Sequence, residues 1–392
     1  MPRPPPLRTD GSNPFARFSM EVRVPRIARD LLEKNPTLAP ASRDAVERLA
    51  CSIEEDAPLP APRSPAPDVE AWTTAHAEHA SERWLAAEWF HAELAFYREV
   101  AHACRFWETD RDPFAPAKDD ELAGERPWSR LEQALERRGA RDERIRELLD
   151  ACLWGNRVDL SYTVGAAHVD RLDDDLLVDD RASAIPLLVR PGARVHVLAD
   201  NAGTELALDL GLVDALVEDP ACCATLHLKA QPVFVSDALP RDVWSTLERM
   251  RARGGATARV ADRLREAFDA GRLLLAPDPF WSGPRFLWEA PSHVTRALSA
   301  ATIVVIKGDA NYRRVVGDAL WPPDAPFAAA AGYAPFPLLC LRTMKSDSVL
   351  GLPRGLAEKL DASDPGWRID ARRGLAQAFL SRVREGDDHR HA

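Results

Sequence analysis

Carboxylate and amide side chains close two of the apolar segments in the second half of this sequence. Asp200 and Asn201 come directly after VHVLA, and Asp237 ends VFVSD. Two aspartates that are brought together repel each other unless a cation lies between them. Carboxylate and amide oxygens are the donors that Mg²⁺ and Mn²⁺ prefer, and three of them leave about half of an octahedral shell open for water and substrate. These three residues are therefore candidate metal ligands and candidate catalytic residues.

A helix start and a lysine accompany these oxygen donors. Gly203 and Thr204 lie where a helix should begin, so free N–H groups and the positive end of the helix dipole would face an anion. Lys345 follows a later apolar segment and would neutralise a phosphate. Metal, helix start and lysine together describe a phosphate site. A single polar residue after a strand is more often a helix cap, which is how we interpret Asp278 in APDPFW, but a cap does not need a lysine nearby.

The hydropathy pattern predicts the elements that hold these residues. Residues 20–185 are mostly helical in pattern, as in SERWLAAEWFHAELAFYREV, where apolar residues recur every three or four positions. From residue 190, short β-rich runs alternate with helical stretches. These runs are ARVHVLAD, ATLHLKA, VFVSD, RLLLAPD, TIVVIKGD and FPLLCLRTMKSD. Because they are apolar on both faces, they predict an α/β fold with a mostly parallel, doubly wound sheet (α/β/α).

A parallel sheet would bring distant residues together. Its strands all end at one edge, and ligands bind in the crevice outside that edge. Polar residues follow most of the predicted strands, so we expect them to converge on one pocket. These residues are Asp200, Asn201, Asp237, Lys307, Asp309, Arg342, Lys345 and Asp347.

Three parts are predicted along the chain. Residues 1–13 form a disordered arm, residues 14–188 a helical domain, and residues 189–385 an α/β domain that carries the metal site. Within the helical domain, the prolines of DAPLPAPRSPAPD (56–68) predict a loop. The stretch WSRLEQALERRGARDERIRELLDACLW predicts two helices that meet near Gly139.

The composition limits the expected partners. The 392 residues include 61 Asp and Glu against 51 Lys and Arg, a net charge of −10. Nucleic acid and anionic membranes need a basic surface, so neither is an expected partner, whereas a small anionic ligand in a local pocket is compatible. The six cysteines show no C-x-x-C spacing, and no segment has the pattern of a signal peptide or a membrane span. We expect a cytoplasmic protein with reduced thiols, and the residues do not indicate its oligomeric state.

Common nucleotide-binding and nucleophile motifs are absent from the sequence. Neither G-x-G-x-x-G, nor G-x-x-x-x-G-K-[ST], nor G-x-S-x-G occurs. The segment VRPGARVHVLADNAGTE is similar to the first motif of methyltransferases that bind S-adenosylmethionine. Its glycine-rich turn, however, is reduced to Gly203.

Several ordered segments carry a family resemblance. In the second half they are DNAGTEL, HLKAQPVFVSD, KGDANYRRVVGD and LRTMKSD, and in the helical half AEWFHAELAFYREV, RDPFAPAK and LWGNRVDLS. From about residue 14 to residue 355 the chain resembles the metal-dependent damage-control phosphatases. It resembles the subgroup marked by an Arg-Thr-x-Lys motif, here Arg342 to Lys345, which has also been described as protein-carboxyl methyltransferases acting on acidic residues.

The resemblance implies a fold, an activity and a set of site residues. It implies a helical N-terminal domain, an α/β/α C-terminal domain, and a phosphatase that uses Mn²⁺, Mg²⁺, Co²⁺ or Ni²⁺ on sugar phosphates such as fructose 1-phosphate and fructose 6-phosphate. Asp200, Asn201 and Asp237 would hold the metal. Glu205 matches the position to which the methyltransferase description assigns the binding of S-adenosylmethionine. The substrate-binding residues would be Asp200, Asn201, Glu205, Asp309, Asn311, Tyr312, Arg313 and Lys345.

The residues leave three functions open. The protein is a phosphatase, a methyltransferase that uses S-adenosylmethionine, or a sugar-phosphate binding protein without catalytic activity. In the phosphatase, the metal either activates a water molecule or leaves Asp200 free to attack the phosphorus atom.

Several single residues also have two interpretations. Asp309 and Asn311 either bind sugar hydroxyls or only organise a turn. Lys307 is either a ligand of the site or the partner of an aspartate. Asn156 and Asp159, in LWGNRVDLS, either line a cleft or form a cap and a salt bridge.

Overall fold

Seven strands form one sheet in the residues that the computed structural model describes, which are 1–136, 139–155 and 175–380. Their order is β1-β7-β6-β5-β2-β3-β4. The five strands β2 to β6 run parallel, β7 is antiparallel to β6, and β1 is parallel to β7. The sheet is mostly parallel, which confirms the predicted fold class. The strands are β1 (Leu176–Asp179), β2 (Arg194–Leu198), β3 (Cys223–Lys229), β4 (Leu273–Asp278), β5 (Ile303–Lys307), β6 (Leu338–Thr343) and β7 (Gly374–Phe379).

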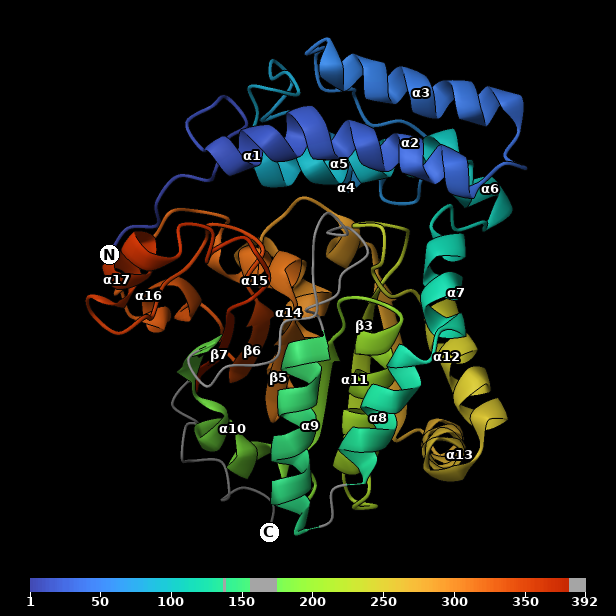
Figure 1. The fold of residues 1–392 in the computed structure, drawn as a ribbon, viewed down its shortest axis with the longest axis vertical. Coiled ribbons are helices and arrows are strands. Elements are labelled where there is room, and N and C mark those ends of the chain that lie inside the picture. The colour runs from blue at the N-terminus through green and yellow to red at the C-terminus, as the bar shows by residue number, and fades with distance from the viewer. Residues whose placement is uncertain (137–138, 156–174, 381–392) are drawn as a thin grey trace.

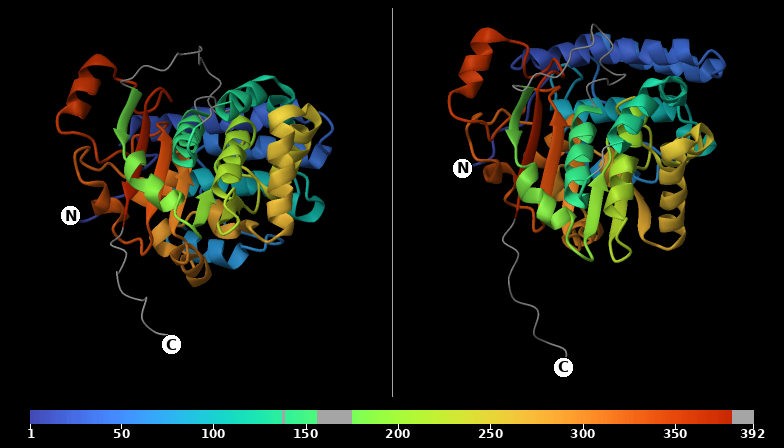
Figure 2. Two further views of the ribbon diagram at one scale, coloured as in Figure 1. Left: turned by 90° about the horizontal axis from the view of Figure 1, so that it is seen from below. Right: turned by 60° about the horizontal axis from the view of Figure 1, so that its bottom comes forward.

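Helices cover both faces of the sheet because its central strands are apolar on both sides (Figure 2). In β5, Ile303 and Val305 belong to one core, and Val304 and Ile306 belong to the other. The first face carries α8 (Arg126–Leu135), α9 (Arg141–Gly155), α10 (Arg181–Leu188), α11 (Thr204–Leu216), α12 (Pro240–Arg253) and α13 (Gly255–Asp269). The second face carries η5 (Pro279–Ser282), η6 (Leu287–Glu289), α14 (Ser292–Ser299), α15 (Asp309–Val316), α16 (Phe327–Ala331) and α17 (Leu356–Ser363).

The remaining N-terminal helices form a cap that lies across one end of the sheet (Figure 1). The cap has its own hydrophobic core, in which Trp89, Phe96 and Val100 of the predicted stripe are buried. The helix α7 (Ala115–Ala123) connects the cap to α8. The cap elements are α1 (Pro14–Phe18), the π-helix η1 (Ser19–Arg23), α2 (Val24–Lys34), α3 (Pro40–Glu54), α4 (Val69–His76), α5 (Trp89–Ala103) and α6 (Phe106–Thr109).

The predicted domain boundary at residue 188 does not coincide with a structural boundary. The helices α8 and α9 pack against α11 and the sheet, and β1 is one of its strands. The prediction assigned α8 and α9 to the helical domain because their sequences are helical in pattern. An apolar stripe on a helix does not indicate whether it packs against other helices or against a sheet. Two strands, β1 and β7, were missed, and VFVSD is a turn instead of the predicted strand.

The predicted disordered arm, residues 1–13, is packed against the rest of the protein. Leu7 is buried, and its N–H donates to the carbonyl of Asp318 at 2.7 Å. The guanidinium of Arg3 lies 3.3 Å from the ring centre of Trp288. The prediction was wrong because the arm is polar and proline-rich, and its order comes from partners far away in the sequence.

All six cysteines are free thiols, and four of them are buried. Within the described residues, no helix combines the length and the apolar character needed to cross a lipid bilayer.

Replacing Thr9 by Val should destabilise the protein, because the arm depends on this side chain. Thr9 is buried, its Oγ1 donates to the carbonyl of Trp84 at 2.9 Å, and it accepts from the N–H of Ala87 at 3.0 Å. Valine has nearly the same shape but leaves both backbone groups without this partner, which costs about 1–3 kcal/mol. Urea denaturation measures the change in the free energy of unfolding.

The control for this substitution is Thr73→Val on α4. Thr73 is exposed and its hydroxyl donates to the carbonyl of Val69 in its own helix, so its replacement should change stability by less than about 0.5 kcal/mol. Equal stability of Thr9→Val and the unmodified protein would mean that the arm is disordered in solution.

Candidate active site

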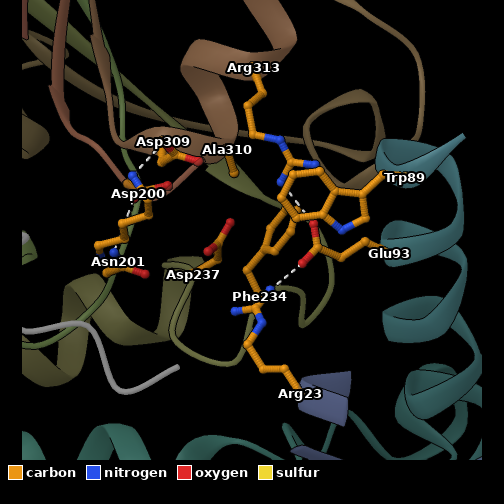
Figure 3. A pocket seen from close by; sticks show the side chains of 11 residues that line it. Arg23, Trp89, Glu93, Asp200, Asn201, Phe234, Asp237, Asp309, Ala310 and Arg313 are labelled. Atoms are coloured by element: carbon orange, nitrogen blue, oxygen red, sulfur yellow. Dashed lines mark hydrogen bonds and ion pairs between the residues drawn. The ribbon is translucent and has the colours of Figure 1, made fainter. Parts of the chain in front are cut away.

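A pocket lies between the carboxyl edge of the sheet and the cap (Figure 3). Six of the predicted site residues line it, so distant segments do meet there. The lining residues are Asp200, Asn201, Asp237, Asp309, Ala310 and Lys345 from segments after β2, β3, β5 and β6, Arg23, Trp89 and Glu93 from the cap, and Phe234 and Arg313.

The two oxygen-bearing segments are held together by backbone pairing. The N–H of Ala238 donates to the carbonyl of Asp200 at 2.8 Å, and an isolated antiparallel bridge pairs Asn201 with Asp237. The turn after β3 therefore folds back onto the turn after β2. This pairing places the side chains of Asp200, Asn201 and Asp237 in the wall of one pocket.

The two aspartates are buried close to other charges. Burial, followed by repulsion from Glu205 and Asp237, raises the pKa of Asp200 well above its ordinary value. Lys229, at the end of β3, lies 3.3 Å from Asp237 Oδ2 and offsets part of the negative charge. A bound cation would relieve the remaining repulsion, because it stabilises the ionised form of both carboxylates.

The amide of Asn201 is fixed in one orientation. Its Nδ2 donates to Asp200 Oδ2 and to Glu205 Oε2, both at 3.1 Å, and its Oδ1 accepts from the hydroxyl of Ser236 at 2.6 Å. An amide oxygen has two lone pairs and can accept more than one bond.

The chemistry of the donors decides whether a hard divalent ion fits. In the described part of the chain, no three His, Cys, Asp or Glu side chains group as a metal site, so a candidate set has to include the amide. Two carboxylates and one amide oxygen in one pocket wall are the oxygen donors that Mg²⁺ and Mn²⁺ take, and the set fits such an ion.

A strained turn and a buried lysine position Asp237. Phe234 has φ 50° and Val235 has φ 66°, a conformation that a β-branched residue rarely adopts. Such strain persists only where the surroundings enforce it. Lys118, in the RDPFAPAK segment, supplies part of this support, since its Nζ donates to the backbone carbonyl of Asp237 at 2.8 Å. Asp112 and Asp242 hold the same amino group, each also at 2.8 Å.

The N-terminus of α11 is occupied by a carboxylate of the protein itself. Glu121 of α7 accepts from the N–H of Thr204 at 2.9 Å and from its hydroxyl at 2.6 Å. A Cβ on Gly203 would lie 2.2 Å from Glu121 Oε2, so glycine allows this close approach. The predicted use of this helix end for phosphate was wrong, because the residue that fills it lies 83 positions earlier in the chain.

A buried ion pair orders the loop of the Arg-Thr-x-Lys motif. Arg342 Nε donates to Asp309 Oδ1 at 2.7 Å, and the same oxygen accepts from the backbone N–H of Lys345 and the hydroxyl of Ser346, both at 3.1 Å. Burial alone would raise the pKa of Asp309, but the nearby guanidinium groups of Arg342 and Arg313 outweigh it and lower the pKa. Asp309 thus anchors the loop that carries Lys345. The three bonds all go to Oδ1 of Asp309, and its Oδ2 takes part in none of them.

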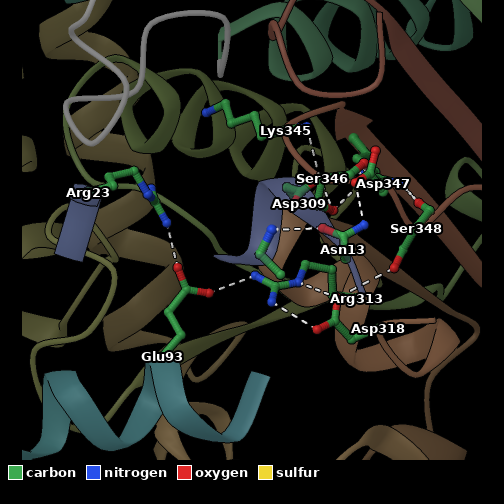
Figure 4. Close-up of polar contacts among 12 residues, drawn as sticks. Asn13, Arg23, Glu93, Asp309, Arg313, Asp318, Lys345, Ser346, Asp347 and Ser348 are labelled. Carbon is green, nitrogen blue, oxygen red and sulfur yellow. Dashed lines mark hydrogen bonds and ion pairs between the residues drawn. The ribbon is translucent and has the colours of Figure 1, made fainter. Parts of the chain in front are cut away.

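The guanidinium of Arg313 is tied to the protein on three sides (Figure 4). Its Nε and one terminal nitrogen donate to Asp318 at 2.7 and 3.0 Å, and the other terminal nitrogen donates to Glu93 Oε2 at 2.8 Å. The group also lies 3.8 Å from the ring centre of Trp89. Arg313 therefore joins the sheet domain to the cap, although the sequence resemblance assigns it to the substrate.

Comparison with known proteins identifies the family. Residues 20–360 match the damage-control phosphatase ARMT1-like domain. The chain belongs to this family. A damage-control phosphatase ARMT1 from Mus musculus is 30% identical over 328 residues, which cover 75% of each chain. The protein of the same name from Danio rerio is 29% identical over 384 residues, which cover 87% of this chain and 85% of the relative.

One solved structure is also similar. It is the crystal structure of a DUF89 family protein from Pyrococcus horikoshii, with a TM-score of 0.47 and 13% sequence identity. The match covers 91% of this chain and 96% of that chain.

Three residues that the ARMT1-like resemblance assigns to the substrate do not line the pocket. Glu205 is buried and accepts from Lys307 Nζ at 2.8 Å. Asn311 bonds to Lys229 and to the carbonyls of Ala199 and Lys307. Tyr312 is buried and donates to Gln377 Oε1 at 2.8 Å. In this structure all three are internal supports, and Asn311 organises the turn, as its alternative interpretation holds.

The structure agrees with one interpretation of Asp278 and with one of Lys307. Asp278 caps η5 by accepting from the N–H of Phe280, as predicted. Lys307 pairs with acidic side chains, in agreement with the second of its two interpretations. Asn156 and Asp159 lie outside the described residues.

Four lining residues and one buried lysine were missed by sequence reasoning. Trp89 and Glu93 lie in the AEWFHAELAFYREV segment, whose polar residues were not separated from its apolar stripe. Lys229 ends β3 just as Lys307 ends β5, so the strand-end pattern contained its signal. Nothing local marks Arg23 or Phe234, which reach the pocket only through the packing of the cap and the strained turn.

Gly308→Ala tests how strongly phosphatase activity depends on the position of the Asp200 carboxylate. Gly308 has φ 84° and ψ 169°, and an added Cβ would lie 1.8 Å from Asp200 Oδ2. The carboxylate would have to move by more than an ordinary fluctuation, so phosphatase activity should fall by about a hundredfold. The backbone conformation alone should cost about 1–3 kcal/mol of stability.

Gly254→Ala is the matched control for that substitution. Gly254 has φ 81° and ψ −167°, and an added Cβ would meet nothing within 4 Å. It should lose about the same stability and keep full activity. If both variants showed the same activity, the dependence on Gly308 would be rejected.

Proposed function

We propose that this member of the family is a divalent-metal-dependent phosphatase that releases inorganic phosphate from small sugar phosphates. The observation that carries the proposal is the backbone pairing of the Asp200–Asn201 segment with Asp237, next to Lys345 in the same pocket. Family membership supports phosphatase chemistry, and the sequence resemblance supports fructose 1-phosphate and fructose 6-phosphate as first substrates to test.

Asp200, Asn201 and Asp237 would hold the ion, for which Mn²⁺, Mg²⁺, Co²⁺ and Ni²⁺ are the candidates. When bound, such an ion supplies positive charge that polarises the phosphoryl group and offsets the charge that develops during hydrolysis. Lys229 Nζ lies 3.3 Å from Asp237 Oδ2, and the hydroxyl of Ser236 donates to the amide oxygen of Asn201.

Among the described residues that line the pocket, Lys345 is best suited to hold the phosphoryl group. Its backbone is fixed by Asp309, and its side chain lines the pocket. A fixed cation next to the reacting group stabilises negative charge on the phosphoryl oxygens without having to reorganise. Asp309 Oδ2 would accept from a hydroxyl of the sugar.

The methyltransferase alternative receives less support. It depends on Glu205, whose two carboxylate oxygens are already bonded to Lys307 and Asn201. A sugar-phosphate binding protein without activity remains distinguishable by assay, because it would bind the ester and release no phosphate.

Phosphate release should require a divalent metal. We expect release from fructose 1-phosphate or fructose 6-phosphate with at least one of the four ions, none in EDTA, and recovery when the ion is added back. A colorimetric phosphate assay measures this. Activity that persists in EDTA after exhaustive dialysis would contradict the proposal.

Asp200→Asn and Asp237→Asn should separate metal binding from folding. Asp200→Asn removes one of two buried like charges, so its metal-free form should be at least as stable as the metal-free parent protein, whereas Asp237→Asn also removes the carboxylate that pairs with the buried Lys229 and should be less stable. A metal that binds only the folded state stabilises it by about 2.7 kcal/mol at a hundredfold excess over Kd, and the variants should lose this increment. Thermal unfolding with and without Mn²⁺ measures both effects, and an unchanged increment would exclude these ligands.

Lys345→Ala should mainly weaken substrate binding. Loss of a hydrogen bond to a charged group costs about 1.5–3 kcal/mol, which corresponds to an increase in KM of about tenfold or more. Lys359→Ala, at an exposed position of α17, is the control and should leave KM unchanged. Unaltered kinetics in Lys345→Ala would reject its role at the phosphoryl group.

A further inference from the structure

The cap contributes a cation to the pocket through an unusual stretch of helix. The segment from Pro14 to Lys34 is helical throughout, but its middle part, η1, is a π-helix that ends at Arg23. π-helical turns are rare and occur frequently at functional sites, because the extra residue in the turn redirects the side chains that follow. Arg23 lines the pocket, and its Nε donates to the hydroxyl of Ser19, one turn earlier, at 3.2 Å.

Arg23 and Arg313 share the carboxylate of Glu93, but they differ in how they are held. Glu93 is fully buried, and each of its oxygens accepts from one of the two guanidinium groups (Figures 3 and 4). Arg313 is also fixed by Asp318 and stacked on Trp89, and its side chain is only 4% exposed. The side chain of Arg23 is 15% exposed, so it presents the larger surface to a ligand.

The two ends of the pocket have different chemistry. Asp200, Asn201, Asp237 and Lys345 occupy the sheet side, where the proposed function places the phosphoryl group. The cap side offers guanidinium donors and the aromatic ring of Phe234. Guanidinium N–H groups can donate to the oxygen atoms of hydroxyl groups. Glu93 and Asp318 balance the charges of the two guanidinium groups, so a neutral hydroxyl-bearing group suits this end of the pocket better than a second anion.

We propose that Arg23 is a specificity-determining residue that binds the hydroxyl groups at the end of the substrate farthest from its phosphoryl group, with Glu93 as the residue that positions it. The inference rests on the proposed phosphatase function and adds to it the source of selectivity for sugar esters. The sheet domain binds the phosphoryl group that is removed, and the cap binds the hydroxyl groups of the sugar that carries it.

The test compares two phosphate monoesters in the full-length protein with Mn²⁺. Fructose 6-phosphate carries the hydroxyl groups, and p-nitrophenyl phosphate carries none. In Arg23→Ala, the ratio of kcat/KM for fructose 6-phosphate to kcat/KM for p-nitrophenyl phosphate should fall by about tenfold or more, the size expected for a lost charged hydrogen bond. Arg23→Gln, which keeps more of the side-chain length, should show the same direction of change.

Arg26→Ala is the matched control, because Arg26 lies three residues later on α2 with a side chain 63% exposed. It should leave the ratio unchanged. Glu93 keeps its bond to Arg313 in the Arg23 variants, so they should fold, which circular dichroism and the unfolding midpoint verify.

Two results would overturn the inference. One is an equal fall in kcat/KM for both esters, or no change in either. The other is a larger loss on fructose 1,6-bisphosphate than on fructose 6-phosphate, which would show that Arg23 recognises a second anion. Failure of the proposed function is a separate result, because the unmodified protein would then release phosphate from neither ester.

Discussion

Negative charge has to be buried at the carboxyl edge of the sheet, and the surrounding structure is arranged around this constraint. Pairing of the turns after β2 and β3 brings Asp200 and Asp237 to one pocket wall, where burial raises the pKa of Asp200. Lysines from three elements compensate: Lys229 ends β3, Lys307 ends β5, and Lys118 belongs to α7. All three are themselves buried, so neutralisation comes from pairing and not from water.

The cap is bound to the sheet domain by the same kind of interaction. Glu93 of α5 lies between Arg23 of the cap and Arg313 of α15, and Asp318 completes the chain of charges. Breaking a buried pair leaves an uncompensated charge, which is costly, so the network fixes how the two parts meet. Selectivity and assembly therefore depend on the same side chains.

Two residues of the turn that carries Asp237 have strained backbone conformations. Phe234 and Val235 adopt positive φ in the turn that carries Asp237, and Gly308 adopts it where the Asp200 carboxylate lies against the chain. For Phe234 and Val235 this conformation is unfavourable in isolation and is maintained by the contacts of the folded protein, whereas Gly308 adopts it at little cost. The position of Asp237 in the pocket wall therefore depends on the packing of its turn.

The sequence by itself determined the parallel sheet, the helices on both of its faces, and the meeting of Asp200, Asn201, Asp309 and Lys345 at its carboxyl edge. Asp237 joins them through a turn that pairs with the segment after β2, not at the end of a predicted strand. Strands that are apolar on both sides can be buried only in this way, and parallel strands end on one side. Only the tertiary structure decided which of the remaining polar residues face the pocket. Glu121 fills the helix end that appeared open to phosphate, and internal partners hold Glu205, Asn311 and Tyr312. A hydrogen-bond partner that is distant in the sequence leaves no pattern among the neighbouring residues, because the pairing depends on where the chain folds back.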